Sequence, residues 1–534
     1  MGPIHAQDQA FLHVGNNYYQ SEDRCLADLR CTDPRDDKIR IEDTKGGLLR
    51  DSYRWVLDNA EFQRWRDDEY SRLLWIKGDP GKGKTMLLCG ILDELTPSTK
   101  LAGHSNGAVL SYFFCQATDS RINSATAVLR GLIYLIVKQQ PSLLSHVQNR
   151  YNDANKELFS DANAWAALSS IFINILSALH QQVTYLVIDA LDECVQDLSR
   201  LLDLIVKNLA FPHIKWVVSS RNVPDIERKL RQDRSQSRLN LELKENADQV
   251  TIAVSSYIEH HVSELLDLQD DINLQARVQD TMQRKANGTF LWVSLVIEEL
   301  KSAESWEVDQ ILNELPSGLE DLYNRMLDQI RRLKREKPRL CQLALSAATI
   351  AYAPLHLLEL GIVSGLSEQV SGGPQSIESI VRLCGSFLTI RKEYVFIVHQ
   401  SAKDFLLKKA SHIVFPSGID SMHYTIFQQS LQIMSKTLRR DVYNLCAPGY
   451  PIEQVKQPGP DPLAAARYSC VYWIDHLHDC RASENAKNQL QGSDGLTSFL
   501  NEKFLYWLEA LSLLKRMANG MRSMTKLETL FEVR

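Results

Sequence analysis

The chain has 534 residues, more than one ordinary hydrophobic core accommodates, so we expect several domains. Hydrophobic residues make up 44% and charged residues 24% of the chain, which is a globular composition and excludes a largely disordered protein. The formal net charge is −6, and this argues against nucleic acid as the main partner, because phosphate-reading proteins usually carry a basic excess or stripe.

The N-terminal residues 1–17 combine no basic segment with a following apolar core, so they do not resemble a secretory signal. The apolar window at 289–297 is about half the roughly 20 residues that a spanning helix needs. The ten cysteines are scattered singly without a C-x-x-C pair, as is typical of a reduced intracellular protein. We therefore expect a cytoplasmic protein without a membrane span.

The first predicted elements are helical. Residues 31–47 alternate charges and suggest a short helix with a loop, within a polar lead over 1–50. Residues 52–68 place aromatic and aliphatic side chains three and four apart, which predicts an amphipathic helix.

Strand and helix patterns then alternate up to residue 264. Helices are expected over 124–138 and 163–182. Several of the predicted strands are continuous apolar runs, as expected for strands covered on both faces. The predicted strands are 73–78, 108–114, 183–191, 214–220 and 238–243. This order predicts an α/β domain over 51–264, in which helices cover both faces of a parallel sheet.

Strand patterns nearly vanish after residue 265, apart from a hairpin predicted over 387–399. Helical patterns precede the hairpin at 339–351, 354–366 and 375–386, and another follows at 399–409. This succession suggests a winged-helix domain, and the rest of the chain is expected to be helical around a loop at 446–462. The expected segments after the sheet are a helical domain (265–337), the winged helix (338–412) and a helical extension (413–534).

The stretch GDPGKGKT, from Gly78 to Thr85, fits the pattern G-x-x-x-x-G-K-[ST] between a strand and a helix. Its glycines let main-chain N–H groups turn toward phosphate oxygens without Cβ clashes, and the start of the next helix adds unpaired N–H groups. Lys84 would bind the terminal phosphates and Thr85 would bind Mg²⁺. The expected nucleotide-binding residues are Gly78, Asp79, Pro80, Gly81, Lys82, Gly83, Lys84, Thr85 and Met86.

A second motif, YLVIDALDEC, places Asp189 at the carboxyl end of a predicted buried strand, where ligands bind in open α/β sheets. We expect Asp189 to hold Mg²⁺, directly or through water. Asp192 and Glu193 follow closely enough to orient or deprotonate an attacking water. Three such close carboxylates repel one another without a cation; the alternative is an N-cap with acidic residues in the first helical turn.

A third strand ends at Ser219-Ser220-Arg221, at the same expected sheet edge. Arg221 could reach the terminal phosphate of a nucleotide. The alternative is a surface arginine in a loop.

These motifs together resemble the NACHT-type signal-transducing STAND NTPases, and more narrowly the fungal NACHT proteins related to heterokaryon-incompatibility factors. The resemblance also rests on CTDPRDDKIRIEDTKGG, KANGTFLWVSLVIEEL, LPSGLEDLYNRML and VHQSAKDFLL, and it covers most of residues 25–410. It implies a helical domain and a winged helix that fold over the nucleotide.

The resemblance also bears on two further positions. His399 resembles the winged-helix histidine that touches the β-phosphate in related switches, although Gln400 replaces the usual following aspartate. Phe290, in ANGTFLW, stands where relatives often carry the proline of a Gly-x-Pro turn, so that base-contact site is not carried over. Family members commonly carry an effector domain before this module and repeats after it, so the chain is expected to be a truncated gene product, a short paralogue or a partner that borrows its sensor.

We therefore expect a switch that binds and slowly hydrolyses ATP or GTP with Mg²⁺, and that opens on nucleotide exchange to bind protein partners or self-assemble. The sequence does not choose between the two bases. A non-catalytic scaffold stabilised by nucleotide is the rival, and a small-molecule kinase is a weaker third reading. His476 and His478 stand two apart on a predicted helix and cannot share one face, which speaks against a metal site there.

Overall fold

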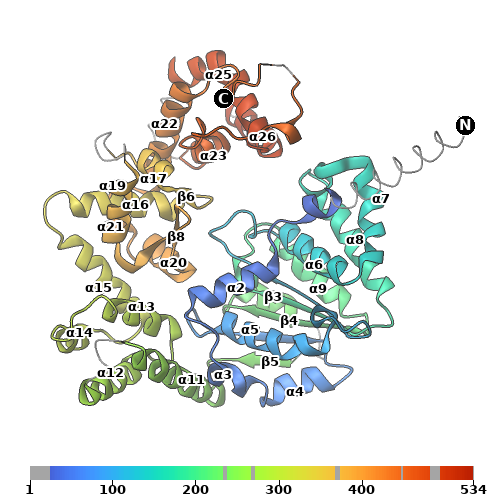
Figure 1. Ribbon diagram of the computed structural model, residues 1–534, viewed down its shortest axis with the longest axis vertical. Helices are drawn as coiled ribbons and strands as arrows, with labels where there is room; N and C mark the ends of the chain where they lie inside the picture. Colours follow the sequence, from blue (N-terminus) through green and yellow to red (C-terminus); the bar gives the residue numbers. More distant parts are fainter. Residues whose placement is uncertain are drawn as a thin grey trace, which may run out of the picture. The chain divides into compact units, whose positions relative to one another are not determined.

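The computed structural model describes residues 24–231, 237–265, 271–366, 373–446, 449–480 and 494–532 (Figure 1). The chain divides into two compact units, with the boundary between Leu319 and Glu320. This boundary lies inside the segment 265–337 that we predicted as a helical domain. The finer division into five segments stays a prediction.

The first unit is built on the five-stranded sheet that the apolar runs predicted. Its strands lie in the order β2-β3-β4-β1-β5, and every neighbouring pair is parallel. The strands are β1 (Leu73–Lys77), β2 (Val109–Phe114), β3 (Thr184–Asp189), β4 (Ile214–Ser220) and β5 (Ser237–Asn240). In a parallel sheet all carboxyl ends lie along one edge, so the segments that follow these strands meet there.

The sheet forms because its strands present almost continuous apolar surface on both faces. Helices must pack on both faces to remove this surface from water. Every residue of β2 is buried, and β3 and β4 each leave a single residue partly exposed. Helices lie on both faces (Figure 1). Among them α5 packs against β3 and β4, and α6 packs along β2. The predicted fold class is thereby confirmed.

The helices of this unit follow the 3.6-residue patterns: α6 matches the predicted segment 124–138 to within one residue, and α8 lies within the predicted segment 163–182 but ends at Ala178. They are α2 (Pro34–Thr44), α3 (Arg50–Tyr53), α4 (Ala60–Asp67), α5 (Lys84–Leu95), α6 (Ala125–Gln139), α7 (Leu144–Ala154), α8 (Ala164–Ala178), α9 (Leu198–Asn208), α10 (Pro224–Leu230), α11 (Lys244–Ser263), α12 (Ile272–Lys285), α13 (Phe290–Leu300) and α14 (Val308–Glu314).

The prediction of one amphipathic helix over 52–68 is wrong. The segment contains the end of α3, a 3-10 turn over Arg54–Val56, and α4. Asn59 is the reason for the break, because its side chain accepts from the N–H of Glu61 and starts a new helix. The aromatic spacing persists across the break, since Tyr53, Phe62 and Trp65 are all buried.

The second unit contains the predicted hairpin, formed by β7 (Leu388–Arg391) and β8 (Tyr394–Ile397), and the short strand β6 (Leu355–His356) pairs antiparallel with β8. The predicted helix at 354–366 therefore begins with a strand. The helices are α15 (Leu319–Arg331), α16 (Lys337–Ile350), α17 (Leu357–Val363), α19 (Pro374–Leu383), α20 (Gln400–Lys408), α21 (Ser411–Val414), α22 (Ile419–Thr437), α23 (Arg467–Asp479), α25 (Asp494–Leu513) and α26 (Met517–Glu532).

The last of these helices enclose their own apolar cluster, which includes Trp473 and Trp507 in edge-to-face contact. Trp507 and Leu511 of α25 are fully buried in it. On α23, His476 is buried and His478 is not, as expected for residues two apart on a helix.

Candidate functional site

The glycine-rich loop connects the end of β1 to the start of α5 at the carboxyl edge of the sheet. Gly81 and Gly83 have φ of 79° and 82°, a region in which only glycine avoids a Cβ penalty. Gly83 is the N-cap of α5, and the helix begins at Lys84. The first N–H groups of a helix lack partners within it, so this loop and helix start can receive an anion.

The Lys84 ammonium lies within the curve of this loop. It donates hydrogen bonds to the carbonyl oxygens of Gly78, at 2.5 Å, and Asp79, at 2.8 Å. Burial lowers the pKa of Lys84, while the nearby carboxylates of Asp192 and Asp189 oppose that effect. The ammonium is therefore a poorly hydrated donor directed at the loop. Of the loop's other predicted residues, Pro80 and Gly81 form a turn, and Met86 lies in the first turn of α5.

Thr85 and Asp189 meet although they are far apart in the chain. The Thr85 hydroxyl donates to Asp189 Oδ2 at 2.7 Å, and the Ser219 hydroxyl donates to Asp189 Oδ1 at 2.5 Å. Asp189 is 3% exposed at the end of β3, and burial raises its pKa. A hydroxyl and a buried carboxylate form the hard-oxygen set that Mg²⁺ prefers, so these residues fit the ion expected there.

Asp192 and Arg221 form an ion pair. The Arg221 guanidinium Nε lies 3.0 Å from Asp192 Oδ2, and the Arg221 main-chain N–H donates to Asp192 Oδ1, also at 3.0 Å. The loop after β3 is thus joined to the end of β4. Arg221 lies in the loop after β4 with its side chain 21% exposed and paired with the acidic motif, and its approach to a phosphate stays a prediction.

Glu193 lies near Asp192 but points to a different partner. Its Oε2 accepts from the N–H of Ala117, after β2, at 3.0 Å. Burial, together with the charge of Asp192, raises the pKa of Glu193 to about 7. The acidic motif does not start an α-helix directly, because Ala190 has φ of 54° and a 3-10 turn over Leu191–Glu193 follows. The N-cap alternative is therefore wrong for Asp189.

Two residues that sequence reasoning missed hold the beginning of the glycine-rich loop. Glu242, after β5, accepts from the Asp79 main-chain N–H at 2.5 Å. The Asn222 amide donates to Asp79 Oδ1 and to Glu242 Oε2, both at 3.2 Å. The signal available in the sequence was their position, because Asn222 follows the predicted strand 214–220 and Glu242 lies near the end of the predicted strand 238–243, at the same sheet edge.

The segment between α12 and α13 packs onto the loop. The Phe290 ring lies against Gly83, where an added Cβ would come within 2.9 Å of it, and Thr289 lies similarly against Gly81 at 2.7 Å. Lys82 Nζ donates to the carbonyl oxygens of Asn287, at 2.8 Å, and Gly288, at 3.0 Å. Lys82, left without a defined role by the sequence, therefore ties the loop to this segment.

His399 lies in the second compact unit as the N-cap of α20. Its Nδ1 accepts from the Ser401 main-chain N–H at 3.1 Å and lies 2.7 Å from the Ser401 hydroxyl. This accounts for its local role, and a contact with nucleotide stays a prediction.

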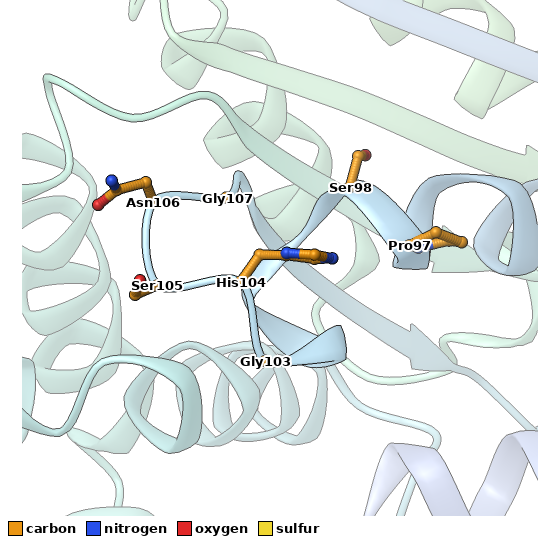
Figure 2. Close-up of a pocket in the computed structure, with 7 residues that line it drawn as sticks. All are labelled: Pro97, Ser98, Gly103, His104, Ser105, Asn106 and Gly107. Carbon is orange, nitrogen blue, oxygen red and sulfur yellow. The ribbon is translucent and has the colours of Figure 1, made fainter.

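A pocket on the first unit is remote from the glycine-rich loop. Figure 2 shows that it is formed by residues 97–98 and 103–107, around the loop that leads into β2. The loop precedes its strand, so it lies at the amino edge of the parallel sheet, opposite the glycine-rich loop.

Comparison with known proteins places this site in a family. A family model described as "Nephrocystin 3, N-terminal" matches residues 51–221, which hold the three motifs. The chain is 50% identical over 527 residues to the vegetative incompatibility protein HET-E-1 of Podospora anserina. The chain is a relative of the fungal NACHT-type incompatibility proteins. The match covers 95% of this NACHT chain, which spans 38% of the length of HET-E-1.

Solved structures offer weaker likenesses. The Aeropyrum pernix ORC1 protein, solved in complex with DNA, is 13% identical with a TM-score of 0.28, covering 68% of this NACHT chain and 92% of its own. A RuvB mutant from Thermotoga maritima is also 13% identical, with a TM-score of 0.26, covering 67% and 95% respectively. Likenesses at this level carry no information about ligands or partners. Within the residues that the structure describes, no helix is long and apolar enough to cross a membrane.

Proposed function

We propose that this NACHT chain is a nucleotide-controlled signalling switch, which binds ATP or GTP with Mg²⁺ and hydrolyses it slowly. The observation that carries the proposal is the 2.7 Å contact between Thr85 and Asp189, beside the Lys84 ammonium. Two motifs separated by about a hundred residues meet where a phosphate-binding loop needs a Mg²⁺ site. The relationship to an incompatibility protein supports the signalling role.

Each residue has a distinct role in this proposal. The loop N–H groups and Lys84 bind the phosphates, and Thr85 and Asp189 hold the Mg²⁺, which would neutralise phosphate charge when bound. Ser219 positions Asp189 by its hydrogen bond to Oδ1. Arg221 would approach the terminal phosphate, and Glu193 would accept a proton from the attacking water.

The local contacts support slow turnover. Arg221 is paired with Asp192, so its reach toward phosphate requires rearrangement of that ion pair. The Glu193 carboxylate is held by the Ala117 N–H, and a pKa of about 7 leaves it partly protonated at neutral pH, when it cannot act as a base.

The switch itself requires differential contacts in its two forms. A shift of the population from 1:99 to 99:1 needs about 10⁴-fold preference, or about 5.5 kcal/mol. Contacts with the terminal phosphate, Mg²⁺ and Arg221 would supply this preference for one form over the other. In this proposal the winged-helix segment 338–412 closes over the diphosphate form through His399, and triphosphate favours an open form that binds protein partners or self-assembles. The ten unpaired cysteines support a cytoplasmic location.

The decisive experiment compares Lys84→Ala with Lys82→Ala. Lys84→Ala would remove a charge-assisted hydrogen bond to phosphate worth about 1.5–3 kcal/mol, so nucleotide affinity should fall roughly 10- to 150-fold. Lys82 points to main-chain oxygens of 287–288 and is the matched control, with a smaller expected loss. Equal affinity in Lys84→Ala and the wild type, measured by titration calorimetry with ATP and with GTP, would overturn the assignment.

A second candidate function is a non-catalytic scaffold that nucleotide stabilises. The hydrogen bond between Glu193 and Ala117 favours it, because a carboxylate used for structure is less suited to proton transfer. Both candidates predict a higher melting temperature with nucleotide. Phosphate release at saturating triphosphate separates them. If the wild type releases phosphate and Glu193→Gln does not, the result supports the switch. If the wild type releases no phosphate, the result supports the scaffold.

A further inference from the structure

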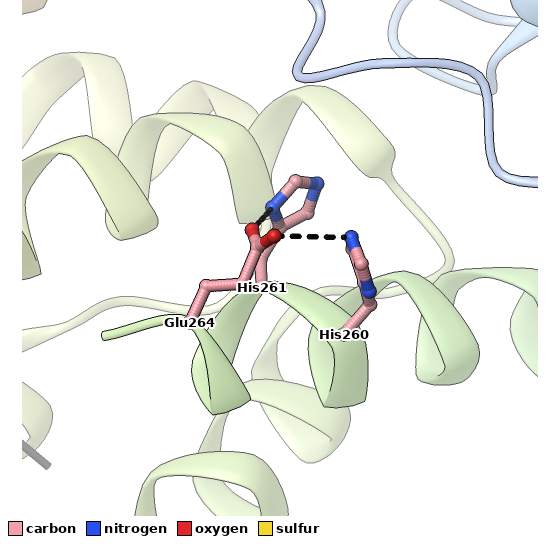
Figure 3. Close-up of side chains that lie close together, drawn as sticks. All are labelled: His260, His261 and Glu264. Carbon is pink, nitrogen blue, oxygen red and sulfur yellow. Dashed lines mark hydrogen bonds and ion pairs between the residues drawn. The ribbon is translucent and has the colours of Figure 1, made fainter. Parts of the chain in front are cut away.

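A cluster of potential metal ligands lies at the carboxyl end of α11, outside the nucleotide site. It comprises His260, His261 and Glu264, whose ligand atoms all lie within 4.8 Å of one another. Figure 3 shows the Glu264 carboxylate joined by dashed lines to both imidazole rings. One carboxylate oxygen lies 3.5 Å from His260 Nε2 and the other lies 3.2 Å from His261 Nδ1.

These separations suit a metal ion. Zn²⁺ binds imidazole nitrogen at about 2.0–2.1 Å and carboxylate oxygen at about 2.0–2.2 Å, so neighbouring ligands of a tetrahedral site lie about 3.4 Å apart. Both nitrogen–oxygen separations are within about 0.2 Å of that value. We propose that His260, His261 and Glu264 bind a transition-metal dication of the Zn²⁺ class, with water in the remaining position.

His261 is 7% exposed, and its Nδ1 faces the Glu264 carboxylate.

His261 is also fixed in place. Its ring packs on Tyr257 at a centroid distance of 4.3 Å, and an added Cβ at Gly46 would come within 2.9 Å of it. Tyr257 in turn donates to the Lys45 carbonyl oxygen at 2.9 Å. A ligand that is already ordered loses little side-chain entropy on binding, which favours affinity. His260 and Glu264 remain accessible, with side chains 43% and 59% exposed, so an ion can enter from solvent.

The test uses the full chain, stripped of metal, titrated with Zn²⁺ alone in the presence of excess Mg²⁺. Mg²⁺ prefers oxygen ligands, so it occupies the carboxylate site near the glycine-rich loop without competing for the histidines. A chromophoric chelator competing for Zn²⁺ reports affinity and stoichiometry. Co²⁺ in place of Zn²⁺ reports tetrahedral geometry through its visible absorption.

His260→Gln and Glu264→Gln are the informative variants, because both residues are exposed and their loss leaves the packing of His261 intact. Each should weaken this one Zn²⁺ site at least about tenfold and reduce the Co²⁺ absorption. Glu259→Gln, an exposed carboxylate on the same helix outside the cluster, is the matched control and should bind like the wild type. Unchanged Zn²⁺ affinity and stoichiometry in both variants, or no tight site in the wild type, would overturn the proposal.

Discussion

Glu193 makes the stability of the first unit depend on pH in a direction opposite to that of an ordinary carboxylate. Its pKa is raised from 4.5 to about 7 in the folded chain, mainly by burial. A carboxyl whose pKa is raised on folding favours the folded state below pH 4.5, and this contribution is lost as the pH rises through 7. We therefore predict that Glu193→Gln, which cannot ionise, stabilises the unit at high pH.

The magnitude follows from the shift of about 2.5 pH units at 1.36 kcal/mol per unit, or about 3 kcal/mol. This is an upper bound because the side chain keeps some contact with solvent. The replacement amide oxygen can still accept from the Ala117 N–H, so the local hydrogen bond survives. At pH 8.5 the gain should approach this bound, and at pH 5 it should be about 1 kcal/mol or less.

Urea unfolding, followed through the transition of the first unit at pH 5, 7 and 8.5, measures the difference directly. Glu69→Gln, at an exposed position of the same unit, is the matched control and should run parallel to the wild type. A constant difference between Glu193→Gln and the wild type across this range would show that the carboxyl is not kept protonated by its surroundings.

Two further changes test the packing and the second unit. Gly90→Ala should lower the free energy of unfolding by about 1–3 kcal/mol in urea melts, because the Cβ of the new alanine would lie 2.3 Å from the Tyr53 ring. Gly495→Ala, where the space is open, should instead gain up to about 1 kcal/mol from helix propensity; equal effects would contradict this account. Burial lowers the pKa of both His423 and His476, whose Nδ1 atoms lie 2.8 Å apart. Stability from this pair is present above about pH 6.5 and lost below it, so acid unfolding of His423→Gln should be shallower than that of the wild type, and parallel profiles would refute this.

The sheet was predictable because its strands are short apolar runs that end at turn residues. The predicted strand 214–220 matches β4 fully, and the other strands differ at their ends by up to three residues. The helix over 52–68 failed for a local reason. Periodicity indicates which side chains face the core, and Phe62 and Trp65 are indeed buried. It does not reveal that one helix ends before Asn59 and that a new helix begins after it.

The site was predictable where a motif specifies the chemistry, and not where the chain's topology does. Thr85 and Asp189 could be paired in advance because a P-loop and an acidic strand end have a known relation. Glu242 and Asn222 could not, because their contact with Asp79 depends on β1 lying between β4 and β5. That strand order is set by long-range packing, which no local pattern encodes.

The place of β1 inside the sheet, between β4 and β5, has a consequence for amide hydrogen exchange. A strand bonded on both sides exchanges its amides only when the sheet itself opens, whereas the edge strands β2 and β5 have one open side. The amides of β1, beneath the glycine-rich loop, should therefore exchange more slowly than those of the edge strands, while Asn287–Thr289, in a short connection between helices, exchanges early. A ligand that binds in the loop would then contact a stable strand on one side and, on the other, a connection between helices that opens easily.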